Sequence, residues 1–161
     1  MSTIRSLLVA PVVLLGLAGC AVDIPADPDG TLDRVSGGAL RVSISPNPPW
    51  TDLPDGPDEE PAGTEVELVE RFAASIDAEV EWVPGGEEDL VGRLEDGALD
   101  LVIGGLTATS PWSQKAALTY RYTATTDEQG EKELRVMAAP MGENAFLSEL
   151  EAFLLDQELP R

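Results

Sequence analysis

The sequence predicts an α/β fold: a single, doubly wound, three-layer lobe with a mostly parallel sheet. Apolar stretches of strand length alternate along the chain with amphipathic stretches of helix length, and Gly or Pro residues separate many of them. Such alternation favours parallel strands that are joined by right-handed helical crossovers. About 140 residues follow position 20, which is enough for one hydrophobic core, and neither an internal repeat nor a second hydrophobic unit is visible. We therefore expect one lobe over residues 39–161.

The first expected strand covers residues 39–45, where Leu40, Val42 and Ile44 alternate with other residues. It ends at the sequence PNPPW, because three prolines are incompatible with strand pairing and with a helix interior. Residues 51–62 are acidic and rich in proline, and they are expected to form a loop.

A helix is predicted from Thr64, because Thr64 and Glu67 match a capping box and apolar residues then recur at helical spacing. The expected apolar face consists of Val66, Val69, Phe72, Ala73 and Ile76. The second strand is expected at residues 80–83, where the sequence VEWV is followed by Pro-Gly-Gly.

The sequence EEDLVGRLEDG over residues 87–97 predicts a short helix, with acids in its first turn and Gly97 just past its end. Three acids at residues 87–89 are the ordinary complement of a helix dipole, and they lack the spacing of a calcium loop. The sequence LDLVIGG over residues 99–105 predicts the third strand, which is buried.

The last third of the chain predicts a mixture of elements. Ser110 and Pro111 resemble a hydroxyl cap followed by a first helical proline, so we expect a short helix there. Residues 116–124 are expected to be extended, a turn follows, and residues 133–140 are expected to form another strand. The final helix, over about 142–155, would carry its apolar face on Phe146, Leu147, Leu150, Phe153 and Leu154.

The first twenty residues predict a secretory signal rather than a part of the fold. Arg5 precedes a short apolar core that is too short to span a membrane, and the segment ends with Leu-Ala-Gly-Cys. This ending resembles a bacterial lipobox, in which the cysteine is acylated and becomes the mature N-terminus. We therefore expect Cys20 to be the lipidation site and residues 21–38 to be a tether to the lobe. An ordinary signal peptide with a chance cysteine is the alternative.

Acidic residues dominate the charge of the chain, which carries 30 Asp and Glu residues, 10 Lys and Arg residues, and no His. Such a surface repels phosphate backbones, so we expect no nucleic-acid partner. An acidic, solvated surface is one interpretation, and attraction of cationic solutes is the other. Without His or a free thiol, and without a visible nucleophile–base pair, the sequence does not favour an enzyme, a metal site or a cofactor.

Three loops follow the carboxyl ends of the expected strands, where ligands bind in open α/β sheets. Trp50 could offer a flat wall to a ligand, or it could anchor its own loop. Gly105, with its neighbouring glycine, would let backbone groups approach a small polar molecule, and Thr107 and Thr109 could supply hydroxyl groups. The free amides of the helix expected after Ser110 could hold an anion, although a plain strand-to-helix turn explains the same residues.

Several stretches together resemble the family-3 extracytoplasmic solute-binding proteins, which serve ABC importers, typically for polar amino acids. These stretches are LRVSISPNPPWT, GTEVELVERFAASIDAEVEWV, LEDGALDLVIGGLTATSPWSQKAALTYRYT and VMAAPMGENAFLSELEAFL. The resemblance implies a lobe like those of type II periplasmic binding proteins. It also implies that Trp50 stacks on the ligand, and that Gly105, Thr107 and Thr109 bind its amino and carboxylate groups.

The sequence departs from this family in two ways. The family commonly has an arginine that clamps the ligand carboxylate, and Trp112 stands at that position here. Lys115 follows one turn later, but it lacks the planar fork of arginine. The family also has two lobes, with the second inserted after the stretch that ends near Tyr122, whereas this chain returns to the first lobe by Val136.

These observations predict a lipid-anchored, extracytoplasmic binding protein of an ABC importer that is reduced to one lobe. Its expected partners are a small polar solute, such as an amino acid, an ABC permease, and the membrane through the N-terminal lipid. The expected ligand-binding residues are Trp50, Gly105, Thr107, Thr109 and Trp112. Two alternatives stay open: an interaction module that binds another protein or a second copy through the exposed cleft, and a relic of a complete receptor.

Overall fold

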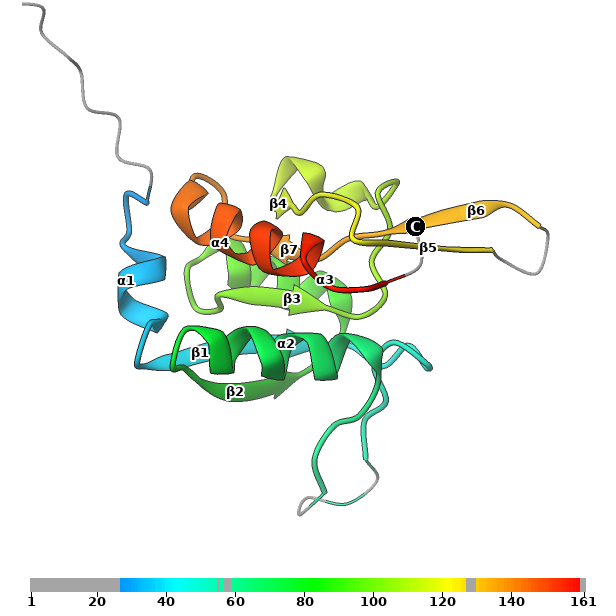
Figure 1. Cartoon of the computed structure of the whole chain (residues 1–161), viewed down its shortest axis with the longest axis horizontal. Coiled ribbons are helices and arrows are strands. Elements are labelled where there is room, and N and C mark those ends of the chain that lie inside the picture. Colours follow the sequence, from blue (N-terminus) through cyan, green and yellow to red (C-terminus); the bar gives the residue numbers. More distant parts are fainter. Residues whose placement is uncertain (1–26, 55, 57–58, 127–129, 160–161) are drawn as a thin grey trace, which may run out of the picture.

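The computed structural model describes residues 27–54, 56, 59–126 and 130–159. Its centre is a five-stranded mixed sheet with the order β2-β1-β3-β7-β4 (Figure 1). Strand β1 (Ala39–Ile44) runs parallel to β2 (Glu79–Pro84) on one side and to β3 (Leu101–Ile103) on the other. The predicted parallel core of three strands is therefore confirmed, and the predicted signal peptide with Cys20 lies outside the described residues.

The far side of the sheet contains the one strand that runs against the others. Strand β7 (Ala138–Ala139) pairs antiparallel with β3, and β4 (Ala117–Leu118) pairs antiparallel with β7. Four of the five strands thus share a direction, which agrees with the expected mostly parallel sheet.

Helices cover both faces of the sheet, as the three-layer prediction requires (Figure 1). Helices α2 (Thr64–Ser75) and α4 (Asn144–Leu155) pack on one face, and α3 (Glu87–Glu95) packs on the other. The alternating strands supply both cores: Leu101 and Ile103 of β3 face the α2/α4 side, and Val102 faces the α3 side.

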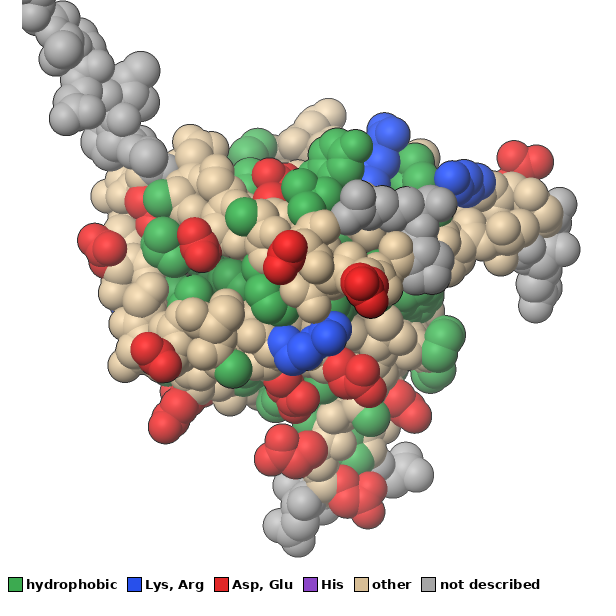
Figure 2. Space-filling view, viewed as in Figure 1, with side chains coloured by type: hydrophobic (Ala, Val, Ile, Leu, Met, Phe, Trp, Pro, Cys, Tyr) green, Lys and Arg blue, Asp and Glu red, His purple; other side chains and the backbone are tan. Residues whose placement is uncertain are grey.

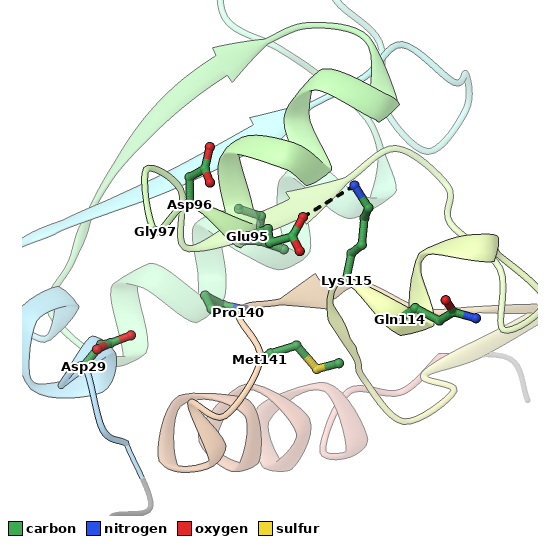
Figure 3. A pocket seen from close by; sticks show the side chains of 9 residues that line it. Asp29, Glu95, Asp96, Gly97, Gln114, Lys115, Pro140 and Met141 are labelled. Atoms are coloured by element: carbon green, nitrogen blue, oxygen red, sulfur yellow. Dashed lines mark ion pairs between the residues drawn. The ribbon is translucent and has the colours of Figure 1, made fainter.

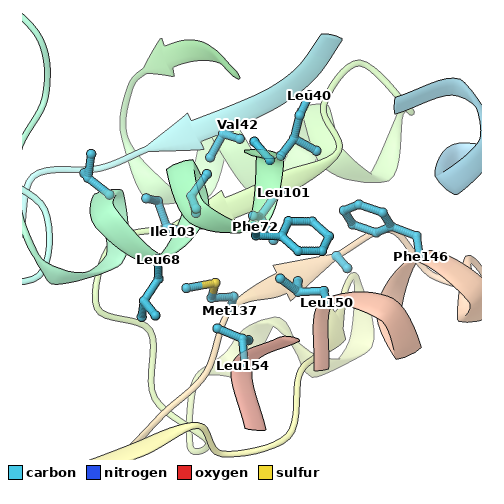
Figure 4. Packing of buried hydrophobic residues seen from close by; sticks show 14 of the residues in the cluster. Leu40, Val42, Leu68, Phe72, Leu101, Ile103, Met137, Phe146, Leu150 and Leu154 are labelled. Atoms are coloured by element: carbon cyan, nitrogen blue, oxygen red, sulfur yellow. The ribbon is translucent and has the colours of Figure 1, made fainter. Parts of the chain in front are cut away.

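The larger core lies between the sheet and helices α2 and α4 (Figure 4). Phe72 on α2 stands at its centre, with ring centroids 5.9 Å from Phe146 and 5.6 Å from Phe153 on α4. Both helices therefore use the apolar faces that the sequence predicts, and α4 begins within two residues of its expected start.

The two extended stretches expected near the C-terminus are each divided between the central sheet and a separate hairpin. Strands β5 (Thr123–Thr126) and β6 (Lys132–Arg135) pair with each other and project away from the body of the lobe (Figure 1). The chain thus leaves the sheet after β4 and returns through β6 directly into β7. Within the described part of this segment, the hairpin stands where the sequence predicts that no second lobe is inserted.

The prediction of a tether over residues 21–38 is wrong for its described part. Helix α1 (Thr31–Val35) lies in this stretch and buries Val35 completely. The carboxylate of Glu143 accepts hydrogen bonds from the amides of Asp29 and Thr31, at 3.0 and 2.9 Å. Burial acts to raise the pKa of Glu143, but these bonds outweigh it and the pKa is lowered. The partner lies more than 110 residues away, so local composition could not reveal this helix.

Ion pairs hold α1 and β1 to the start of β3. Asp100, which is fully buried, accepts hydrogen bonds from Arg34 at 2.7 Å and from Arg41 at 2.6 Å. Burial works to raise the pKa of Asp100, but the hydrogen bonds from Arg41 and Arg34 prevail and the pKa is lowered.

Among the described residues, none of the helices combines the length and apolar character that crossing a bilayer requires.

Candidate functional site

The loop after β1 positions Trp50 at the carboxyl edge of the sheet. The amide of Trp50 donates to the carbonyl of Asn47 at 2.9 Å, and the Thr51 hydroxyl donates to the carbonyl of Ser45 at 2.6 Å. The carbonyls of Pro49 and Trp50 in turn accept the first amides of α2, from Thr64 and Glu65. The loop therefore fixes both the indole and the start of the helix, and Trp50 is half-buried.

This arrangement corrects the predicted capping box. Gly63 is the N-cap residue of α2, and no side chain caps the helix. The reason is that the helix begins one residue earlier than a Thr64 cap requires: the Gly63 carbonyl accepts the Glu67 amide at 3.0 Å, which is the amide that a Thr64 hydroxyl would cap. A Cβ atom at Gly63 would lie 2.3 Å from the Trp50 carbonyl oxygen, so this close approach requires glycine.

The glycines after β3 pack beneath the same loop. Gly105 has a φ of 67°, and a Cβ atom there would lie 2.5 Å from Nδ2 of Asn47 and 2.9 Å from Cδ1 of Trp50. The Asn47 side chain donates to the Gly104 carbonyl at 2.8 Å. Gly105 is thus adjacent to Trp50, as the prediction for the site requires.

Glu65 on α2 binds the backbone of Gly104 and Gly105, and no local pattern in the sequence marks this role. Its Oε2 atom accepts both amides, from Gly104 and Gly105, at 2.9 Å each. Its Oε1 atom accepts the hydroxyl of the buried Tyr122. The idea that these two amides are open to a guest is therefore wrong, because the protein's own carboxylate uses both of them.

The buried position of Glu65 shapes the electrostatics of this edge. Burial raises the pKa of its carboxyl, while the hydrogen bonds from Tyr122 and the two glycine amides and the charge of Arg135 act in the opposite direction. Burial and the neighbouring carboxylate raise the pKa of Tyr122, which keeps its hydroxyl protonated and able to donate. The edge thus contains a carboxyl group whose charged form the fold disfavours.

Arg135 at the end of β6 completes the cluster and was also missed. Its guanidinium carbon lies 4.7 Å from the centroid of the Trp50 ring, and its Nη1 atom donates to the Gly105 carbonyl at 2.6 Å. Its Nη2 atom is bonded to the Glu133 carboxylate, and the side chain is 10% exposed. In the sequence, Arg135 is an ordinary polar residue of an alternating strand, so no local signal marks it.

The two predicted threonines lie beside this cluster. Thr107 forms an isolated bridge with Arg135 through the backbone, and its hydroxyl lies 3.0 Å from the hydroxyl of Thr109. Thr109 is exposed and Thr107 is half-buried. The structure thus brings together Trp50, Gly105, Thr107 and Thr109, with Arg135 among them.

Trp112 has different neighbours. Its indole nitrogen donates to the Glu87 carboxylate at the start of α3, and its ring packs against the core on the α3 side of the sheet. The expected helix after Ser110 is a four-residue 3-10 helix, η1 (Pro111–Gln114), without a side-chain cap, so it offers no long helix dipole to an anion. Lys115 pairs with Glu95 at 3.4 Å.

Two hollows lie at the opposite, amino-terminal edge of the sheet. One has a volume of about 260 Å³ and is lined by residues such as Asp29, Glu95, Pro140 and Met141 (Figure 3). The other, of about 380 Å³, adjoins the buried Asp100. Neither contains the residues that surround Trp50. Within the described ranges, no group of three or more acidic, His or Cys side chains is arranged to hold a metal ion.

The model of the bacterial extracellular solute-binding proteins, family 3, matches residues 40–156. No curated protein matches the chain.

Solved structures with similar folds include three binding proteins. The arginine-bound form of domain 1 from TmArgBP is 21% identical, with a TM-score of 0.65, and the match covers 74% of this chain and 94% of that one. An ancestral cationic amino acid solute-binding protein is 15% identical, with a TM-score of 0.68 over 77% and 92% of the two chains. The L-cystine solute receptor of Neisseria gonorrhoeae is 12% identical, with a TM-score of 0.63 over 76% and 88%. These likenesses show a shared fold.

Proposed function

Because the chain belongs to the bacterial extracellular solute-binding proteins of family 3, we propose that its single lobe binds a small polar solute, such as an amino acid, at the carboxyl edge of the sheet. The observation that carries this proposal is the meeting of Trp50, Gly105 and Thr107 at one place, from loops that follow β1 and β3. An aromatic wall beside hydroxyl groups suits a guest with both apolar and polar parts.

A solved structure of one domain with a bound solute supports the proposal. The arginine-bound form of domain 1 from TmArgBP matches 74% of this chain, and the match covers 94% of that domain. The β5–β6 hairpin stands where a second lobe would be inserted, so the guest at this edge keeps one face in water.

The missing second lobe sets the expected affinity. A hydrogen bond that stays in contact with water contributes about 1 kcal/mol, so losing three or four contacts weakens binding roughly 10²- to 10³-fold. A dissociation constant below one millimolar but above the micromolar range is therefore expected. Closure of two lobes around the guest, which other receptors use as a signal, has no counterpart here.

Thermal unfolding of residues 27–161 against millimolar amino acids, polyamines, sugars and short peptides tests the proposal. A solute that binds only the folded lobe raises its melting temperature. We expect one chemical class to raise it by a few degrees, and we expect Trp50→Leu to abolish that rise. Trp82→Leu is the matched control, because Trp82 packs on the α2/α4 core and should leave the response unchanged. A wild-type lobe that responds to no solute would contradict the proposal.

We further propose that Cys20 carries a lipid and that the lobe delivers its solute to an ABC permease. The lipobox-like ending of the signal segment supports the first part, and membership of family 3 supports the second. Mass spectrometry of the mature protein tests the anchor. A diacylated Cys20 is expected at the N-terminus, and Cys20→Ala should release the protein from the membrane fraction.

The alternative of a protein-interaction module finds less support. It relies on tryptophans that are open to a partner, whereas Trp50 and Trp112 are both half-buried, and the indole nitrogen of Trp112 donates to Glu87 within the lobe. A melting temperature that rises with protein concentration and ignores solutes would favour that alternative.

A further inference from the structure

The place beside Trp50 already contains a cation. The guanidinium carbon of Arg135 lies 4.7 Å from the centroid of the Trp50 ring, close enough for a cation–π contact. We propose that Arg135 is the resident ligand of its own lobe: its guanidinium fills a cation site made by the Trp50 ring, the Gly105 carbonyl and the Glu133 carboxylate. A free cationic side chain would then reach Trp50 only where Arg135 is absent.

The contacts of Arg135 are those of a bound ligand rather than of a receptor group. Its Nη1 atom donates to the Gly105 carbonyl at 2.6 Å, its Nη2 atom to Glu133, and its Nε atom to the Thr125 hydroxyl at 3.4 Å. Three of the five N–H groups are thus directed to the protein, and the side chain is 10% exposed. A guanidinium that is meant to receive a solute carboxylate would need exposure and free donors, so an anion-binding role fits this geometry poorly.

The carboxylate of Glu133 favours a cation at this place, because it is in direct contact with the guanidinium. Removal of the Arg135 side chain would leave an aromatic face, a backbone acceptor and this carboxylate around a vacated volume. Such a site has the chemistry that recognises guanidinium groups.

The hairpin explains how the chain delivers this cation. Arg135 is the last residue of β6, and its backbone bridges to Thr107 in the loop after β3. The segment that replaces an inserted second lobe therefore carries the group that covers the aromatic wall. This inference rests on the proposed function insofar as both place the guest at Trp50.

The test compares the wild-type chain with Arg135→Ala, titrated with methylguanidinium chloride against sodium chloride of equal ionic strength. Melting temperature and tryptophan fluorescence are the readouts. We expect Arg135→Ala to bind methylguanidinium at least tenfold more tightly than the wild type, and to lose this response when Trp50→Leu is added. Arg121→Ala is the matched control, because this arginine is exposed and its loss should leave the wild-type behaviour.

Equal responses of Arg135→Ala and the wild type to methylguanidinium would overturn the inference, as would no response of the folded variant. If Arg135→Ala does not fold alone, refolding is repeated with methylguanidinium: recovery of the fold supports the inference, and no recovery overturns it. The proposed function is judged separately. A wild-type lobe that binds a neutral amino acid, combined with a silent Arg135→Ala variant, would retain the function and reject the resident cation.

Discussion

Strand β3 (Leu101–Ile103) has a buried carboxylate near each end, and the two ends are built differently. Before the strand, Asp100 is in direct contact with the guanidinium groups of Arg34 and Arg41. After it, Glu65 accepts bonds from two neutral amides and a tyrosine hydroxyl, and the nearby Arg135 is bonded to other groups. The fold lowers the pKa of Asp100 and raises that of Glu65.

This difference separates an ion-paired end of the strand from the end where we propose that a solute binds. The charged form of Asp100 is stabilised by its partners, so this end ties α1 and β1 to the sheet. The charged form of Glu65 is disfavoured by burial, and the arginine next to it is directed toward Trp50. A carboxyl group with a perturbed pKa close to an aromatic side chain supports the proposed solute site.

The largest effect is expected at the amino end. Asp100→Asn removes a buried charge that two arginines contact, and we expect it to lower the free energy of unfolding by about 2–4 kcal/mol; the arginines are partly exposed, which keeps the loss below that of a fully buried pair. Urea denaturation measures it. Since the fold lowers the Asp100 pKa, its contribution is present above the ordinary value of about 3.9 and is lost as pH falls through the folded-state pKa. If the stability of Asp100→Asn falls with decreasing pH as much as that of the wild type, the Asp100 carboxylate does not stabilise this end of the strand.

Alanine substitutions of Gly105, at the carboxyl edge, and of Gly97, at the amino edge, compare the two edges next. Gly105→Ala places a methyl group against Asn47 and Trp50 and strains a residue with a φ of 67°, so a loss of about 2–3 kcal/mol is expected. Gly97→Ala at the amino edge has a φ of 72° but meets nothing within 4 Å, so only the backbone strain of about 1 kcal/mol remains. Thermal unfolding compares the two variants. Equal losses would mean that the loops at the carboxyl edge can move apart.

Much of the scaffold for this comparison could be predicted from the sequence. Helices α2, α3 and α4 and the first three strands follow from apolar periodicity, because their burial depends on residues three or four apart, or two apart. The proximity of Trp50, Gly105 and the two threonines could be predicted because they follow β1 and β3 at one edge of the sheet, whereas their role in binding stays a prediction.

The roles of the charged residues Glu65, Arg135 and Glu143 could not be predicted, because their hydrogen-bond partners are distant in sequence. Glu65 reads as an ordinary acid of a first helical turn, and only its contact with residues 39 and 40 positions later shows its role. Arg135 contacts Gly105 across 30 residues, and Glu143 caps α1 across more than 110. A helix of five residues such as α1 also has too little periodicity to be recognised without that partner.

A smaller effect is expected for Glu65→Gln. The fold already disfavours the charged carboxylate, so the neutral amide avoids the cost of burying that charge. It also loses charge-assisted hydrogen bonds, and we expect a net decrease of about 1 kcal/mol in the free energy of unfolding. The sign of its pH dependence is opposite to that of Asp100. Because the folded-state pKa of Glu65 is raised, stability falls as pH rises from the ordinary value of about 4.3 through the folded-state pKa, and Glu65→Gln should remove that fall. Chemical denaturation across this pH range measures the stability of both proteins. A larger loss of stability for Glu65→Gln than for Asp100→Asn would contradict the stated order of the two ends.

The smallest change in stability is expected for Thr109→Val, within about 0.5 kcal/mol, because Thr109 is exposed. Its effect should instead appear in solute binding, with an affinity about three- to tenfold weaker, since a hydroxyl that lies 3.0 Å from the Thr107 hydroxyl is lost from the proposed site. Calorimetric titration measures this with the solute found by thermal unfolding. Thr126→Val on the projecting hairpin is the control, and an equal loss of affinity there would remove Thr109 from the site.

Helix α1 has a consequence for where the lobe stands. Hydrogen bonds to Glu143 fix the chain from Asp29 onward. Asp27 is fixed as well, because its carboxylate accepts the amides of Leu32 and Phe146. Only residues 21–26 remain between Cys20 and this anchored stretch, and six residues span at most about 20 Å when fully extended. A lobe lipidated at Cys20 would therefore be confined to the immediate vicinity of the bilayer surface, where it would exchange solute within a thin layer above the lipid headgroups.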